Sequence, residues 1–309
     1  MRAALALLLI AVVLAVKAQP GTRAEDVEAR LAPALGALGR GDFAQAIDVL
    51  QPIARDGHPQ ALYLLGLVYE SASPPVRDYA QARAFYLRAA EARHADARTN
   101  LATLLLEGRG GDRNPAEAAR WYRAAGEQGH PEALHALALM FGTGDGVERD
   151  EGEMAKWLER AARAGSARAQ AQLARMYLEG DGVPQDARAA ARLFRAAADQ
   201  GHVWAMYFLG RLAQKGEGVP RNLEAAREWF ERAANAGHAL AQHELATVYE
   251  LGLGAESSTA KALELYRTAA ARGAVESIRR LEQAYRNGEL GLAKSESEAA
   301  QWGARLPKN

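Results

Sequence analysis

Histidine is the residue type in this chain best suited to bind a metal ion or to move a proton, and the sequence contains seven. Five of them follow a glycine or an arginine at intervals that are multiples of 36 residues: His58, His94, His130, His202 and His238. Such spacing indicates one structural position repeated along the chain. We expect each imidazole there to bond a carbonyl group freed at a helix end, and therefore to be structural.

The other two histidines, His135 and His243, lie three repeats apart. A helix is about 10 Å wide and each repeat supplies two helices, so these imidazoles are too distant to share one metal ion. The sequence has no cysteine, which excludes a thiolate zinc site, a disulfide framework and a cysteine nucleophile. We therefore predict no metal site and no other cofactor.

The sequence SSTAK places Ser258 and Lys261 at the Ser-x-x-Lys spacing of penicillin-binding enzymes. The S-D-N and K-T-G motifs that accompany this pair in such enzymes are absent from the sequence. Ser258 also belongs to a series of residues that precede helices, which favours a helix N-cap over a nucleophile. Glycine-rich turns such as GTGDGV match neither a dinucleotide-binding loop, a P-loop nor a calcium loop. The sequence predicts that the protein is not an enzyme.

The chain begins with MRAALALLLIAVVLAVKAQPG, in which a basic Arg2 precedes an apolar run from Ala3 to Val16. This run suits a secretory signal and is short for a membrane span. No cysteine follows for a lipid anchor, so we expect cleavage after Ala18 and a periplasmic or secreted protein without membrane insertion. An uncleaved membrane anchor is the alternative.

Loss of Arg2 and Lys17 with the signal reduces the basic residues from 38 to 36, against 38 acidic residues. The mature net charge of −2 predicts no binding to nucleic acid or to anionic membranes by bulk electrostatics. Abundant alanine and little alternation of β-branched residues favour helices.

Two helices are predicted in each 36-residue period. The first, helix A, begins just after the Gly-His pair and carries a small residue and then, four positions later, a leucine that never varies. The second, helix B, carries a pair of large residues before a pair of small ones, which makes one apolar face. The leucines are Leu65, Leu101, Leu137, Leu173, Leu209, Leu245 and Leu281, and the predicted N-caps of helix B are Asp42, Asp78, Asn114, Asp150, Asp186, Asn222 and Ser258.

The combined pattern, A-x3-L-G/A-x2-Y, G-x-G-V and D/N-x3-A-x2-W-Y/F-x2-AA-x2-GH, resembles the Sel1-like repeat, a relative of the tetratricopeptide repeat. The resemblance implies an all-α, right-handed superhelical α-solenoid with helix A on its concave side. We expect a signal peptide at 1–18, N-terminal capping helices at 19–58, six repeats at 59–274 and a degenerate capping repeat at 275–309. Pro33 is expected to interrupt a helix of the first cap, and Lys294 falls at the N-cap position of the last.

Helix A positions that differ between repeats are not needed to build the fold, so they are candidates for partner binding. A 100° step per residue places positions 60, 63, 64, 67 and 71, and their equivalents, opposite the core. The first repeat there has Tyr63, Leu64 and Leu67, and His135 and His243 share the column of Tyr63. The fifth repeat has Trp204, Tyr207, Phe208, Arg211 and Lys215, and we predict that it is the main contact. The structural rival is that Trp204 and Phe208 pack against the next repeat.

The leading interpretation is a non-catalytic, monomeric periplasmic or secreted adaptor that binds a protein partner of the cell envelope through helix A. The resemblance suggests envelope assembly, exopolysaccharide export or restraint of a sensor kinase. The alternatives are a penicillin-recognising hydrolase, since some proteins of this repeat family have been linked to penicillin binding, and a groove for peptides or glycans.

Overall fold

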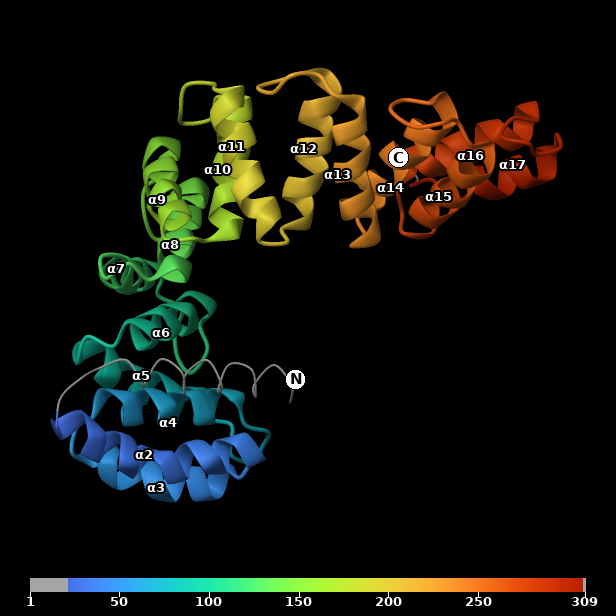
Figure 1. Cartoon of the computed structure of the whole chain (residues 1–309). Helices are drawn as coiled ribbons and strands as arrows, with labels where there is room; N and C mark the ends of the chain where they lie inside the picture. The colour runs from blue at the N-terminus through green and yellow to red at the C-terminus, as the bar shows by residue number, and fades with distance from the viewer. Residues whose placement is uncertain (1–21, 308–309) are drawn as a thin grey trace. The chain divides into compact units, whose positions relative to one another are not determined.

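The computed structural model describes residues 22–307, which form sixteen α-helices and no strand. The predicted signal peptide lies outside these residues. Helices A and B alternate along the chain as the 36-residue period predicts, and Figure 1 shows that consecutive helices pack side by side within residues 22–164 and within residues 165–307. None of the helices within residues 22–307 is long and apolar enough to cross a membrane.

The helices in the A positions are α2 (Thr22–Arg40), α4 (Pro59–Ser71), α6 (Ala95–Glu107), α8 (Pro131–Thr143), α10 (Ala167–Glu179), α12 (Val203–Lys215), α14 (Ala239–Leu251) and α16 (Val275–Asn287). The helices in the B positions are α3 (Phe43–Arg55), α5 (Tyr79–Glu91), α7 (Pro115–Gly126), α9 (Glu151–Arg163), α11 (Ala187–Asp199), α13 (Leu223–Asn235), α15 (Thr259–Ala271) and α17 (Glu296–Gly303).

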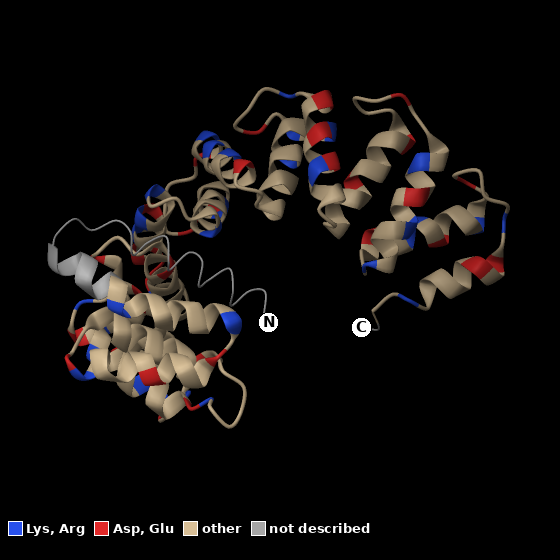
Figure 2. Cartoon of the chain, turned by 60° about the horizontal axis from the view of Figure 1, so that its bottom comes forward, with Lys and Arg blue, Asp and Glu red and all other residues tan. Residues whose placement is uncertain are grey.

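The chain divides into two compact units, residues 1–164 and residues 165–309. In each unit the leucine of helix A and the large residues of helix B meet in the core. In the second unit, for example, Phe194, Leu209 and Phe230 are at most 4% exposed and belong to one cluster. Figure 2 shows that acidic and basic residues are distributed along the helices of both units.

The Gly-His pairs join each helix B to the next helix A, but the predicted role of the histidine is wrong. The glycine ends helix B in the left-handed region, as at Gly201 with φ 86°. Four of the five histidines then cap the start of helix A through Nδ1, which accepts the backbone N–H three residues ahead, at 3.3 Å for His202 and 3.2 Å for His238. His58 occupies the same position without this bond. The carbonyls at the end of helix B already accept backbone N–H groups, as Ala197 does from His202, so they do not need the imidazole.

The predicted N-caps of helix B are confirmed, with one exception. Ser258 accepts the N–H of Lys261 at 3.5 Å, and Asp150 accepts that of Glu153 at 2.9 Å. In the last repeat the cap is Ser295 rather than Lys294, because only the serine has a side-chain oxygen to offer.

Pro33 does not interrupt the first helix, contrary to prediction. Helix α2 runs from Thr22 to Arg40 with Pro33 inside it. Pro33 is exposed, so the carbonyl that loses its helical N–H partner can be hydrated by water.

Replacing His202 and His238 with serine is expected to reduce the loss of stability between about pH 7 and about pH 5, a range that brackets the reference pKa of histidine. Burial lowers the pKa of both histidines, and Arg168 lowers that of His202 further. A lowered folded-state pKa leaves stability complete above the unfolded pKa of about 6.5 and removes it as pH falls toward the folded value. Protonated Nδ1 also cannot accept the capping bond, which is worth about 0.5–2 kcal/mol.

Urea unfolding of wild type and of the double variant at the two pH values measures this effect. Serine is a sound replacement because Ser166 already caps α10, accepting the Ala169 N–H at 3.3 Å. An equal loss of stability in both proteins would show that other groups cause it.

Candidate functional site

The column of Tyr63 is predicted to point away from the core, and this orientation is wrong. Tyr63 and Tyr207 are each 5% exposed. Each ring lies against the capping histidine of the next repeat, with 4.5 Å between the centroids of Tyr63 and His94 and 4.9 Å between those of Tyr207 and His238. Helix A contacts the next repeat as well as its own helix B, so it has more than one buried face.

Leu64 and Leu67 of the first repeat are also buried, at 0% and 7% exposure, whereas exposure is predicted. Helix α4 packs against α3, α5 and α6, which leaves little of its surface open. No exposed surface at Tyr63 or Leu67 supports the partner-binding role predicted for them.

His135 and His243, the other predicted members of the Tyr63 column, are half-buried on α8 and α14. His243 Nδ1 lies 2.9 Å from the Ser277 hydroxyl of α16, and its ring lies 5.4 Å from that of Tyr266. Burial lowers the pKa of His243. His243 therefore helps to join two repeats, and its predicted role in partner binding stays a prediction, as does that of His135.

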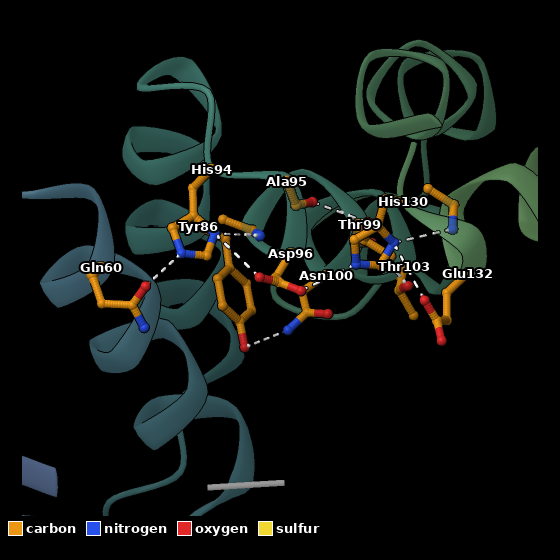
Figure 3. A network of polar contacts seen from close by, with 12 residues as sticks. Gln60, Tyr86, His94, Ala95, Asp96, Thr99, Asn100, Thr103, His130 and Glu132 are labelled. Atoms are coloured by element: carbon orange, nitrogen blue, oxygen red, sulfur yellow. Dashed lines mark hydrogen bonds and ion pairs between the residues drawn. The ribbon is translucent and has the colours of Figure 1, made fainter. Parts of the chain in front are cut away.

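A polar network joins the second residue of α4 and of α6 to the capping histidine of the next repeat (Figure 3). His94 Nε2 lies 2.9 Å from the Gln60 amide oxygen, and His130 Nε2 lies 3.1 Å from an Asp96 carboxylate oxygen. Since Nδ1 of each ring accepts a backbone N–H, Nε2 carries the proton and donates it. The bond from His130 lowers the pKa of Asp96, and burial lowers that of His94. This network joins repeats and leaves no free donor at these sites.

A groove of about 290 Å³ lies between α10 and α12 in the second unit. It is lined by Arg168, Ala171, Gln172, Arg175, Phe194, His202, Trp204 and Phe208. Two of the residues predicted for partner binding, Trp204 and Phe208, therefore share one surface. Arg211 and Lys215 do not line the groove; they lie further along α12.

The aromatic rings of the groove are held in place by their neighbours. Trp204 is 53% exposed and stands edge-on to His238, with 4.8 Å between centroids and 81° between planes. Phe208 is half-buried and stacks on Phe194 of the preceding repeat, at 4.9 Å and 9°. The rival prediction, that both rings pack against the next repeat, holds for Trp204, whereas Phe208 stacks on the preceding repeat instead. Both rings still line the groove. Tyr207 lies beneath them and accepts a hydrogen bond from Arg211 at 3.3 Å.

Sequence reasoning missed the other wall of the groove. Arg168, Gln172 and Arg175 stand in the fourth repeat at the positions of Trp204, Phe208 and Arg211 in the fifth. Arg168 and Arg175 are exposed, and Arg175 bonds Glu179 one turn along α10 at 2.5 Å. These three residues stand at variable helix A positions, but the sequence shows that they face the aromatic residues of the fifth repeat only when the two repeats are aligned.

Two kinds of site considered in the sequence analysis are a Ser-x-x-Lys nucleophile and a metal centre. Ser258 is an N-cap, and the Lys261 ammonium lies 4.9 Å from the centre of the Tyr249 ring. No group of three metal-ligating side chains comes together within residues 22–307. The groove between α10 and α12 presents aromatic rings and guanidinium groups, which are suited to binding a partner.

A profile of the Sel1 repeat matches six segments of the chain: 59–94, 95–130, 131–166, 167–202, 205–238 and 239–273. No curated protein matches it.

Solved structures support the same assignment. A protective antigen of uropathogenic Escherichia coli that displays an SLR fold is 30% identical, with a TM-score of 0.85 over 95% of this chain. This chain covers 63% of that protein, so it spans less than two thirds of that relative. A Sel1 repeat protein from Oxalobacter formigenes is 26% identical, with a TM-score of 0.70 over 80% of this chain and 97% of that one. The chain belongs to the Sel1 repeat family.

Proposed function

We propose that this protein is a non-catalytic scaffold of the cell envelope that binds a protein partner through the groove between α10 and α12. The groove itself carries the proposal, because its Trp204 is 53% exposed beside Phe208 and two exposed arginines. Tryptophan and arginine are the usual energetic anchors of protein interfaces. Rings fixed by neighbouring side chains lose little conformational entropy when a partner binds.

Two further observations support the proposal. Sel1 repeat proteins generally act as protein-interaction scaffolds. The composition of residues 1–18, a basic residue followed by an apolar run, is typical of a secretory signal and supports a periplasmic or secreted location. In this proposal residues 19–58 and 275–309 cap the array, and the protein acts as a monomer.

Site-specific crosslinking tests the proposal. A photoreactive phenylalanine analogue at Trp204 is expected to yield one major adduct in cells that produce the protein from its own gene. The Trp204→Ala variant is expected to bind the crosslinked protein about thirtyfold more weakly, the effect of losing a hot spot of about 2 kcal/mol. Affinity is measured by surface plasmon resonance with both purified proteins.

The matched control places the same analogue at Arg192, which is exposed on α11 of the fourth repeat and away from the groove. Adducts that form equally from both positions, or full affinity of a folded Trp204→Ala variant, would contradict the assignment of this groove.

A further inference from the structure

In the first two repeats, the second residue of helix A contacts the capping histidine of the repeat that follows. Gln60 and Asp96 use this position to accept a hydrogen bond from His94 and His130. In the fourth repeat the same position is Arg168, which is close enough to His202 to lower its pKa, after the larger effect of burial. A guanidinium has no acceptor to offer to an imidazole N–H.

Two hydrogen-bond donors at the groove are therefore left over. Arg168 forms no ion pair or hydrogen bond with any of residues 22–307. The Nδ1 atom of His202 accepts the Ala205 N–H, so its Nε2 carries the proton, and within the described chain this N–H has no acceptor either. Both side chains line the groove. Water can hydrate both donors in the free protein, and an acceptor from a partner can replace that water; a carboxylate fits the planar fork of arginine best.

The floor of the groove differs from its equivalents in a second way. In three other repeats the large residue in the middle of helix B is a tyrosine, Tyr86, Tyr122 or Tyr266, whose hydroxyl bonds helix A side chains. Tyr86, for example, donates to Glu70 at 2.6 Å and accepts from Asn100 at 3.1 Å. In the groove, Phe194 takes the place of Tyr86 and Phe208 that of Asn100. Their stacked rings make the floor apolar. A volume of about 290 Å³ lies at the lower end for ligand pockets and suits one bulky apolar side chain.

From this arrangement we infer that the groove binds an acidic peptide segment of the partner, with an aromatic or large aliphatic side chain on the Phe208 floor and an adjacent Asp or Glu at Arg168 and His202. The inference rests on the proposed function and names the chemistry of the partner. A nucleic acid or other polyanion would need a continuous row of cations. Here Glu179 forms an ion pair with Arg175, and Glu217 and Glu244 lie close to Arg211. Acidic side chains therefore interrupt the row of cations along α10 and α12.

Selection of a random dodecapeptide library on the immobilised full-length protein tests the inference. Enriched peptides are expected to carry an aromatic or leucine residue flanked by Asp or Glu. The Arg168→Gln variant is expected to bind the best peptide about tenfold more weakly by fluorescence polarisation, the loss expected from removing a close charge pair. Raising NaCl from about 0.05 M to about 0.5 M should weaken wild type far more than the variant, because salt screens exposed charges.

The Arg192→Gln variant removes a cation from α11, outside the groove, and is expected to bind as wild type does. An Arg168→Glu variant should reject the selected peptide and prefer its counterpart with Lys in place of the acidic residue. Such a reversal of preference requires the charge to meet Arg168 directly.

The outcomes separate this inference from the proposed function. Peptides without acidic enrichment that still lose affinity in Trp204→Ala would overturn the acidic partner and leave the groove as the binding site. Oligogalacturonate that displaces the selected peptide at equal molar concentration would replace the peptide by a polyanion. Peptides insensitive to Trp204→Ala, or no enriched peptide, would overturn both.

Discussion

Replacing Gly218 with alanine is expected to lower the free energy of unfolding of the second unit by about 2–5 kcal/mol. Gly218 lies in the turn between α12 and α13 with φ 68°, a conformation that costs an L-residue about 1–2 kcal/mol. Its added Cβ would also overlap the carbonyl of Ala187, the first residue of α11. Since backbone cannot rotate away as a side chain can, the overlap adds a packing cost of about 1–3 kcal/mol. Urea unfolding followed by circular dichroism measures the sum.

Gly201→Ala is the matched control for this prediction. Gly201 also has a positive φ, 86°, but a Cβ there would meet no atom within 4 Å. Its cost should therefore be only the backbone cost, about 1–2 kcal/mol. Equal losses of unfolding free energy at Gly218 and Gly201 would show that the turn makes no tight contact with the preceding repeat. If the loss at Gly218 is larger, we also expect weaker binding at the groove, because this turn packs the fifth repeat against the fourth.

The framework of the fold is predictable from the sequence because the same requirement recurs in every repeat. The leucine of helix A, the N-cap of helix B and the glycine that ends helix B each occur at one position per 36 residues, and each has one physical cause. The structure confirms the two-helix period. The role of the capping histidine was not predictable in the same way, since a residue between two helices can serve either end.

The open surface of helix A is less predictable, for a geometric reason. A 100° step per residue divides a helix into one buried and one exposed side, but α12 is enclosed by its own helix B and by the preceding and following repeats. Tyr207 is consequently buried against His238, while Trp204, one turn earlier, is exposed. The groove needs two repeats to exist, so Arg168 could be recognised only by comparing the fourth repeat with the fifth.

The largest expected loss of binding comes from placing on the floor of the groove the Tyr–Asn pair that joins the first and second repeats. In the double variant Phe194→Tyr and Phe208→Asn, the floor copies Tyr86 and Asn100, which share a hydrogen bond of 3.1 Å. The chain already folds with this pair elsewhere, but Phe208→Asn also removes a half-buried ring that stacks on Phe194, so we expect a loss of stability of about 0.5–3 kcal/mol. Binding of the partner protein or of the selected peptide should fall by thirtyfold or more, roughly the effect of losing a hot spot.

So large an effect is expected because the variant removes one of the two stacked rings and makes the floor polar. A hydroxyl and an amide on the floor must be stripped of water by any apolar side chain that enters, and that side chain offers them no hydrogen bond in return. Phe230→Tyr is the control, because it adds the same hydroxyl at the same place in the next repeat, outside the groove. If the double variant folds and binds as wild type does, the aromatic floor has no part in recognition and only the rim of Trp204 and the arginines can carry it. If Phe230→Tyr weakens binding equally, the loss reports a general change in the array. Only a loss confined to the double variant locates the apolar anchor of the partner on Phe194 and Phe208.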